Sequence, residues 1–385
     1  MSAKGPQMSA SQANMMARNL VLSAGVERLQ QIYSGSVDPA TDGPINIAPR
    51  NVGLIRGFLV KVEGSINVDG TDTDTATLAP FGVANMLSNI QFQDLNNITR
   101  INCPGWYLSL INSAKQPMVF GGAYAPNVPV GYGNNFDVMV GPSTIADTVT
   151  SAVQMYYYVP LAYTKLDLRG AMYAGVVNAT AQLSLTVNPT PGVDATDRVT
   201  SLYYGSDGIT WSGEVTVTVW QDYIDQLPMN KGVPILPMED LSLTYQLMQT
   251  TMQGMVSGQD FGIPFANYRS FISATVVLDN GVTPFLNNGD EVNYFSLEAA
   301  NSSLIFKYGP EEASLLARGI FTADPPLGTY HFSFRNKPIT TQNFGNMQLN
   351  INPNANINAA AYAMVGYEQF ATLSQVTFAS SLPSS

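Results

Sequence analysis

Charged side chains, histidine and cysteine are scarce in this chain of 385 residues. Only 12% of the residues are charged, about half of the ~25% found in an average soluble protein. His331 is the single histidine and Cys103 the single cysteine. One cysteine excludes an intrachain disulfide framework, and one ligand of each kind is too few for a zinc site. We therefore expect no cofactor and no enzyme activity.

Long hydrophobic runs and a concentrated basic surface are also missing. The longest apolar stretch, Val153 to Tyr163, is interrupted by Gln154 and Pro160, so it falls short of the ~18 apolar residues of a membrane-spanning helix. The 17 Lys and Arg are scattered and the net charge is −11, which argues against direct, sequence-specific nucleic-acid binding. No secretory signal is visible, and we expect folding in a reducing cytoplasm.

Aromatic and hydrophobic residues are abundant instead. The chain has 45% hydrophobic residues, 19 Tyr, 17 Phe and 16 Met, which argues against disorder. Interface cores are depleted in charge and enriched in Tyr, Phe and Met. The composition therefore favours a folded protein whose surface is largely covered by partners.

The chain contains an internal duplication, because five landmarks recur in the same order. The pairs are Gly57–Val62 with Ser270–Val277, Cys103–Pro104 with Gly309–Pro310, Tyr156–Pro160 with Phe334–Pro338, Gln182–Pro189 with Gln348–Pro353, and Trp220–Tyr223 with Tyr367–Phe370. The offset falls steadily, from 213 between Phe58 and Phe271 to 147 between Trp220 and Tyr367. Chance similarity would scatter the offsets, so we predict two copies of one β-rich module.

Local patterns predict mostly short strands with a few helices. Alternating apolar and polar residues predict the strands, and Gly- and Pro-rich segments separate them. Helices are expected over Gln12–Tyr33, Gly105–Ala114, Met238–Met255 and from Pro310 to Gly319. Residues 117–151 are expected to form a long loop, and Pro189–Gly213 a larger protrusion than its counterpart in the second copy. Such a pattern favours a β-sandwich or jelly roll.

The best candidates for a cation site are Asp69, Asp72 and Asp74, because closely spaced carboxylates suit Ca²⁺. Their spacing does not follow a calcium-loop pattern, and a solvated turn is the simpler interpretation. His331 lies in an apparent strand without the motif of a catalytic serine, which favours a structural role. Cys103 precedes a helix start, where a thiol can be acidified, but a buried inert thiol is the simpler interpretation.

Several segments resemble one protein family. They are Asn51–Gly53 with Gly57–Val62, Asn112–Gln116, Tyr157–Tyr163 with Asp167–Leu168, Tyr223–Pro228 and Gly366–Phe370. In this order they are similar to the major capsid proteins of tectiviruses, tailless icosahedral phages with an internal membrane. The resemblance is poor in residues 1–49, in the Pro189–Gly213 insert and in the last 15 residues, so contacts of the arms cannot be transferred.

The resemblance implies an all-β fold of two tandem eight-stranded jelly rolls, a double jelly roll, with short helices and an N-terminal helix. We assign residues 1–49 to an N-terminal helix or arm, 50–232 to the first jelly roll, 233–370 to a linker helix and the second jelly roll, and 371–385 to a C-terminal tail. It also implies a homotrimer, because six barrels around a threefold axis make a near-hexagonal tile.

The implied location is the outer shell of a virion that is assembled in the host cytoplasm. The implied partners are other copies of the chain, penton or vertex proteins, minor capsid proteins and the internal viral membrane. In this family the N-terminal helix lies toward the membrane, where Lys4 and Arg18 would suit anionic headgroups.

Two other functions remain open from the residues alone. A virion spike or lectin-like β-rich binding protein would use exposed aromatic residues and form no lattice. A cupin-like enzyme shares the jelly-roll fold, but a single histidine makes its usual metal site hard to assemble.

Overall fold

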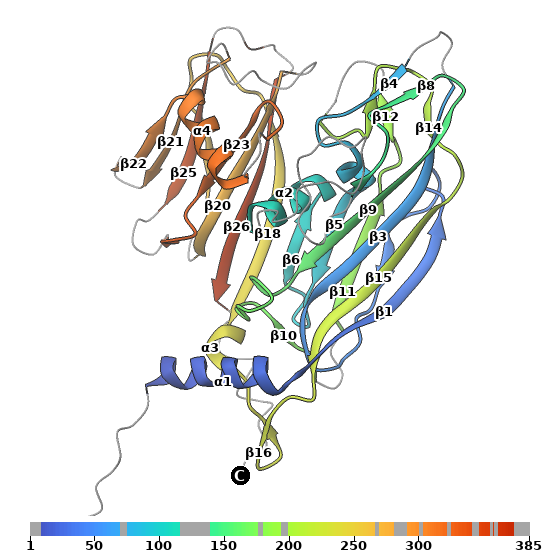
Figure 1. Ribbon diagram of the computed structural model, residues 1–385. Helices are drawn as coiled ribbons and strands as arrows, with labels where there is room; N and C mark the ends of the chain where they lie inside the picture. The colour runs from blue at the N-terminus through green and yellow to red at the C-terminus, as the bar shows by residue number, and fades with distance from the viewer. Residues whose placement is uncertain are drawn as a thin grey trace, which may run out of the picture.

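The computed structural model describes residues 9–69, 75–115, 139–175, 180–193, 199–265, 269–280, 291–299, 303–321, 325–340, 346–354, 357 and 361–372. Two β-barrels stand side by side in it, with the helix α1 lying across one end (Figure 1). Each barrel has two facing sheets, and the alternating apolar residues of the strands fill the space between them.

Eight strands form the two main sheets of the first barrel. One sheet has the order β1-β15-β3-β9, and the facing strands have the order β2-β11-β5-β6. Their bounds are β1 Val26–Val37, β2 Ile45–Ile47, β3 Leu54–Val68, β5 Leu87–Gln93, β6 Thr99–Cys103, β9 Thr150–Pro160, β11 Gln182–Val187 and β15 Val215–Asp225. Phe58, Val60 and Val62 on β3 are fully buried in this core, as their alternation predicts.

The second barrel is built in the same way. Its sheets have the orders β18-β26-β20-β23 and β19-β25-β21-β22. The bounds are β18 Leu243–Gln253, β19 Phe261–Pro264, β20 Arg269–Asp279, β21 Val292–Ala299, β22 Ser303–Tyr308, β23 Thr329–Ser333, β25 Met347–Pro353 and β26 Tyr362–Thr372. Its core is smaller and includes Phe271, Phe295 and Tyr330.

The predicted duplication is confirmed by this topology. Taken in chain order, the eight strands of the first barrel occupy the same sheet positions as the eight strands of the second. Helix α2 (Gly105–Lys115) follows β6, and helix α4 (Pro310–Phe321) follows β22 in the same way. One landmark matches less well, because Phe334–Pro338 lies in the turn after β23 rather than within a strand.

The helix predicted over Gln12–Tyr33 is wrong in its second half. Helix α1 (Ala10–Ala24) begins at a Ser9 capping box and ends at Gly25, whose backbone is extended. A Cβ at Gly25 would lie 2.3 Å from Cγ2 of Ile224. From Val26 onward the chain is β1, paired along its whole length with β15. The strand partner thus overrides a local pattern compatible with a helix.

The helix predicted over Met238–Met255 is also mostly a strand. Only α3 (Met238–Leu241) is helical, and β18 follows it and pairs with β26 over its whole length. Tyr245 and Leu247 are both fully buried. Leu243 and Leu247, whose spacing of four residues favours a helix, fit a strand period of two equally well.

Shorter elements complete the structure, and the Pro189–Gly213 insert contributes to them. The bounds are β4 Thr75–Leu78, the 3-10 helix η1 Gly82–Met86, β7 Met139–Val140, β8 Thr144–Ala146, β10 Met172–Tyr173, β12 Gly192–Val193, β13 Tyr203–Tyr204, β14 Ile209–Trp211, β16 Met229–Asn230, β17 Val233–Pro234 and β24 Ile339–Thr340. A small sheet of β12, β13, β4 and β8 lies at the end of the first barrel away from α1 (Figure 1). Strands β7 and β8 lie within the expected long loop, whose residues 116–138 are outside the described ranges.

Candidate functional site: the junction between the barrels and the basal face

The single histidine, His331, and the single cysteine, Cys103, are both buried, each in its own environment. Nδ1 of His331 lies 2.8 Å from the Thr275 hydroxyl, and burial together with the charge of Arg335 lowers the pKa of His331 to about 3. Burial raises the pKa of the Cys103 thiol. These environments favour structural roles for both residues.

Among the residues that the structure describes, no three His, Cys, Asp or Glu side chains lie close enough together to hold a metal ion. Asp69 is exposed, while Asp72 and Asp74 lie outside the described residues. A cation site at these three residues therefore stays a prediction. Among the described helices, none is both long and apolar enough to cross a bilayer.

A continuous sheet joins the two barrels. Strand β6 of the first barrel pairs in parallel with β18 of the second, with Ile101 opposite Leu247 and Asn102 opposite Met248. The side-chain amide of Gln246 on β18 donates to the backbone oxygen of Thr99, with 3.2 Å between Nε2 and O. Backbone hydrogen bonds therefore fix one barrel against the other directly.

A buried group of charges surrounds Glu368 at this junction. One carboxylate oxygen accepts from the Tyr245 hydroxyl at 2.5 Å and lies 2.9 Å from Nζ of Lys115 at the end of α2. The other accepts from Ser273 Oγ at 2.9 Å and lies 3.5 Å from Nη2 of Arg335. Because Lys115 belongs to the first barrel and the other groups to the second, this cluster ties the barrels together.

The positive charges control the ionisation of Glu368. Burial alone would raise the pKa of this carboxyl, but Lys115 and Arg335, with the hydrogen bond from Tyr245, outweigh burial and lower the pKa to about 2. Arg335 also donates to the backbone oxygen of Ala114, close to the negative end of the α2 dipole. Glu368 is therefore ionised at neutral pH and is the centre of the junction.

Close backbone approach accompanies these charges. Gly366 on β26 lies against the ring of Tyr107 on α2, and a Cβ at this glycine would be 2.1 Å from Cε2 of that ring. Any larger residue at position 366 would push α2 away from the second barrel. The junction thus depends on packing as well as on charge.

A second charged contact fixes α1 against α3. Asp240 on α3 accepts two hydrogen bonds from Arg18, with distances of 2.6 Å from Nε and 2.5 Å from Nη2, and one from Asn14 at 3.0 Å. Asn14 in turn accepts from the backbone amide of Glu239. Arg18, predicted to face a membrane, thus also has an intramolecular role, while Lys4 lies outside the described residues.

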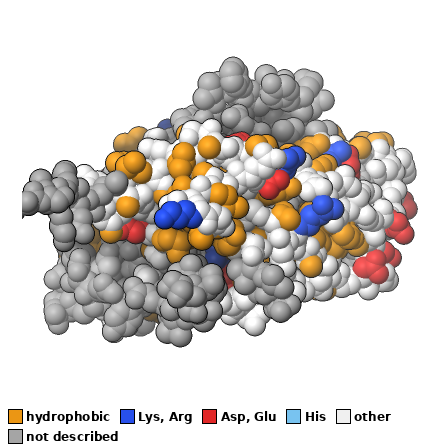
Figure 2. Space-filling view, turned by 90° about the horizontal axis from the view of Figure 1, so that it is seen from below, with side chains coloured by type: hydrophobic (Ala, Val, Ile, Leu, Met, Phe, Trp, Pro, Cys, Tyr) orange, Lys and Arg blue, Asp and Glu red, His pale blue; other side chains and the backbone are white. Residues whose placement is uncertain are grey.

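The end of the molecule that carries α1 exposes large apolar side chains, and we call it the basal face. Its members are Met15, Met16 and Leu20 on α1, Met229 and Val233 on the β16–β17 hairpin, and Met238 on α3, which are between 40% and 63% exposed. Figure 2 views this end and shows hydrophobic side chains gathered there with isolated Lys and Arg among them. Exposed apolar groups in this density indicate a contact surface.

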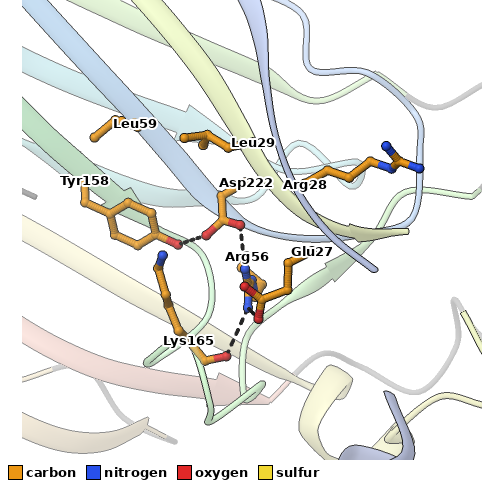
Figure 3. Close-up of a pocket in the computed structure, with 8 residues that line it drawn as sticks. All are labelled: Glu27, Arg28, Leu29, Arg56, Leu59, Tyr158, Lys165 and Asp222. Carbon is orange, nitrogen blue, oxygen red and sulfur yellow. Dashed lines mark hydrogen bonds and ion pairs between the residues drawn. The ribbon is translucent and has the colours of Figure 1, made fainter. Parts of the chain in front are cut away.

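A small pocket lies on the outer side of the first barrel, beside β1 (Figure 3). Its volume is about 230 Å³. Buried Arg56 donates to Glu27 on β1 and to Asp222 on β15, both at 2.7 Å, and the Tyr158 hydroxyl donates to Asp222 at 2.8 Å. These opposite charges are paired with one another, so the arrangement anchors β1 to the barrel rather than offering a free reactive group.

Sequence reasoning did not identify the junction residues. In the sequence, Glu368 is only a landmark of the duplication, and Lys115 is only one residue of a segment that carries the family resemblance. The one available signal was an acidic residue within an otherwise buried aromatic strand, Tyr367–Phe370, which calls for a buried positive partner. Nothing in the sequence indicates that this partner is Lys115.

Comparison with known families gives two adjacent matches. The model of the P3 major capsid protein N-terminal region matches residues 4–227, and that of the C-terminal region matches residues 242–384. The major capsid protein P3 of Enterobacteria phage PRD1 is 33% identical over 374 residues, which cover 96% of this chain and 94% of that protein.

Solved structures share the fold at low sequence identity. A chain in the atomic structure of Sulfolobus Turreted Icosahedral Virus has a TM-score of 0.63 at 12% identity, covering 93% of this chain and 94% of that one. VP54 of PBCV-1 has a TM-score of 0.55 at 11% identity, covering 90% and 93%. These similarities establish the double jelly-roll fold.

These findings decide between the three functions left open by the residues. Both the family and the PRD1 relative are capsid proteins, structural components rather than enzymes. The match covers nearly the whole chain, so neither a cupin-like enzyme nor a separate spike or lectin is supported.

Proposed function

The chain belongs to the family of P3 major capsid proteins, and from this premise we propose that it forms a homotrimeric, pseudo-hexagonal capsomer. Such capsomers would tile the outer icosahedral shell of a virion over an internal membrane. Assembly would take place in the host cytoplasm, with penton or vertex proteins and minor capsid proteins as further partners.

The observation that carries this proposal is the pair of equivalent, directly joined barrels. Both barrels have one strand order, and they are joined by a continuous sheet and by the buried charges around Glu368. Three copies around a threefold axis would place six similar barrels in a ring. A ring with a near-hexagonal outline can contact six neighbours, which explains why one duplicated chain suits a shell.

The basal face supports an orientation with α1 toward the membrane. On α1, Met16 and Leu20 lie nearly opposite Arg18 around the helix, as 3.6 residues per turn requires, and Met15 is exposed on its flank. Apolar side chains with few charges suit the boundary between headgroups and acyl chains. Residues 1–8, which include Lys4, would extend this contact.

Light scattering of the purified protein tests the proposal. We expect a stable particle of about 124 kDa, three times the chain mass of 41.4 kDa, because a symmetric ring reuses one contact three times. Negative-stain images of that species should show a near-hexagonal outline. A mass of 41.4 kDa at micromolar concentration would contradict the capsomer.

A further inference from the structure

Several strands at the ends of the sheets have one edge without a strand partner among the described residues, and β1 and β22 are two of them. Strand β1 pairs only with β15, and β22 pairs only with β21. They lie on opposite sides of the molecule, β22 on the second barrel and β1 on the first (Figure 1). Unpaired edges of this kind are templates for pairing with another chain.

The duplication identifies what each edge is equivalent to. Strand β1 corresponds to β18, since each follows a helix and pairs with the last strand of its barrel. Strand β22 corresponds to β6, since each is the second strand of a hairpin and precedes a helix. Within the chain, β6 and β18 pair with each other in parallel.

We propose that β22 of one copy pairs in parallel with β1 of the next copy, repeating between copies the β6–β18 junction found within each chain. The pairing is head to tail, because the two edges belong to different barrels. It rests on the proposed trimer and adds to it the surface through which the copies meet. Three such contacts would close the ring.

The register of this contact on β22 follows from a shared irregularity. In the pairing of β5 with β6, Arg100 has no residue opposite it on β5. In the pairing of β21 with β22, Ile305 has none opposite it on β21, at the same position of the hairpin. Asn102 is two residues beyond Arg100, and Lys307 is two residues beyond Ile305. Lys307 is therefore the equivalent of Asn102.

The register on β1 follows from the starts of the strands. Val26 pairs with the end of β15, and Leu243 pairs with the end of β26. Met248 and Gln31 are each five residues beyond these starts. Because Met248 faces Asn102 within the chain, Gln31 of one copy should face Lys307 of the next.

Exposed apolar residues support this register. In the internal junction Gln246 contacts Thr99. The equivalents are Leu29 and Leu304, each 56% exposed. The proposed contact would bring these two leucines together and remove both from water.

Helix α4 carries a second apolar surface beside β22. Leu315 is 68% exposed and Leu316 45% exposed, whereas Ser109 and Leu110, at the same turn of α2, are fully buried. The α2 turn is buried beside the internal junction, and the equivalent α4 turn is exposed because the chain has no such junction beside β22 within the described ranges. We expect the neighbouring copy to cover this part of α4 as well.

Engineered cysteines test the pairing. A chain with Gln31→Cys and Lys307→Cys should form disulfides between copies under mild oxidation, because partners on adjacent strands lie about 4.8 Å apart, within the range that a disulfide spans. The native Cys103 is buried and gives a low background. We expect most of the protein to run as a covalent trimer on a non-reducing gel and as a monomer after reduction.

Two controls make the test specific to register and direction. Ser36→Cys combined with Lys307→Cys places the thiols five residues out of register, roughly 16 Å apart along the strand, and should give less than a tenth of the cross-linked product. Each single variant alone should give none, since a head-to-tail contact never brings two copies of one position together. Circular dichroism should confirm that all variants keep the wild-type fold.

The outcomes separate this inference from the trimer itself. A wild-type trimer whose Gln31→Cys, Lys307→Cys variant does not cross-link would overturn the β22–β1 contact and leave the capsomer standing. Equal cross-linking by the out-of-register pair would overturn it too. A wild-type monomer would overturn both.

Discussion

At the scale of single residues, Glu368 has the largest consequences. It is fully buried, yet it is surrounded by two cations and two hydroxyl donors. Breaking a buried ion pair from one side costs about 3–5 kcal/mol, because the remaining charges stay buried without compensation. Glu368 therefore links the stability of one barrel to the position of the other.

Stability in acid tests this role. The folded-state pKa of Glu368 is lowered to about 2 from 4.5, so its contribution is complete above pH 4.5 and is lost as the pH falls toward 2. The shift corresponds to about 3 kcal/mol. Glu368→Gln should be less stable than wild type at pH 7 in denaturant unfolding, and the difference should narrow as the pH drops through this window.

Glu214→Gln is the matched control, since Glu214 is exposed. Its free energy of unfolding should stay within about 0.5 kcal/mol of the wild-type value from pH 7 to pH 2. If the difference in free energy of unfolding between Glu368→Gln and wild type stayed constant from pH 7 to pH 2, the carboxylate would not be coupled to Lys115 and Arg335 as described.

Some residues matter less than their sequence positions indicate. Trp220 and Tyr367 are half-buried on their strands rather than fully buried, so their truncation should cost less than the ~3–5 kcal/mol expected for a fully buried aromatic. They mark the duplication because they occupy equivalent positions on β15 and β26, not because they form the centre of a core.

At the scale of elements, the helices before β1 and β18 are equivalent but differ in length. Helix α1 has 15 residues and α3 has four, and the buried carboxylate of Asp240 holds the two together. Strands β1 and β2 lie within residues 1–49 and belong to the first barrel, so this segment is more than a helical arm.

Arg18→Ala should loosen α1 without unfolding the barrel. The change leaves Asp240, which is 3% exposed, without its charged partner, and such loss costs about 1–3 kcal/mol. Hydrogen exchange of residues 10–24 should become at least fivefold faster, while β1 amides stay protected. Arg28→Ala, which breaks an exposed pair with Asp225, should leave α1 unchanged; equal effects of both changes would argue against the α1–α3 contact.

At the scale of the whole molecule, the low charge content and the exposed apolar residues have one explanation. In the proposed shell, repeated contacts between identical walls would avoid the cost of removing many charges from water. Many of the exposed apolar groups lie at the basal face and on β1, β22 and α4. Each of these surfaces faces outward from the barrel pair and is available to another copy or to a membrane.

Binding to vesicles tests the orientation of the basal face. Wild-type trimer should co-sediment with phosphatidylglycerol vesicles, and Met15→Glu with Met16→Glu should weaken this binding at least tenfold, because acidic groups would replace apolar ones at the lipid boundary. Leu327→Glu alters a residue that is 53% exposed near the opposite end and should bind as wild type. Loss of binding by Leu327→Glu alone would place the membrane at the other end.

The sequence by itself determined the duplication, the β class and the helices after β6 and β22. These features depend on local alternation, on proline at a helix start and on the order of landmarks, all of which are properties of neighbouring residues. Resemblance to the capsid family added the double jelly roll, and the family match and the shared folds confirm it.

Only the tertiary structure decided that β1 and β18 are strands. It also decided which charged side chains form buried ion pairs, such as Lys115 with Glu368. Leu243 and Leu247 are four residues apart, which fits a helix and a strand alike, and pairing with β26 makes this segment a strand. At β1 the apolar steps of three and four residues favour a helix, and pairing with β15 overrides them. Lys115 and Glu368 belong to different barrels, and neither carries a local mark of the other. Burial and strand pairing are properties of the folded chain, because they depend on contacts between distant residues rather than on local pattern.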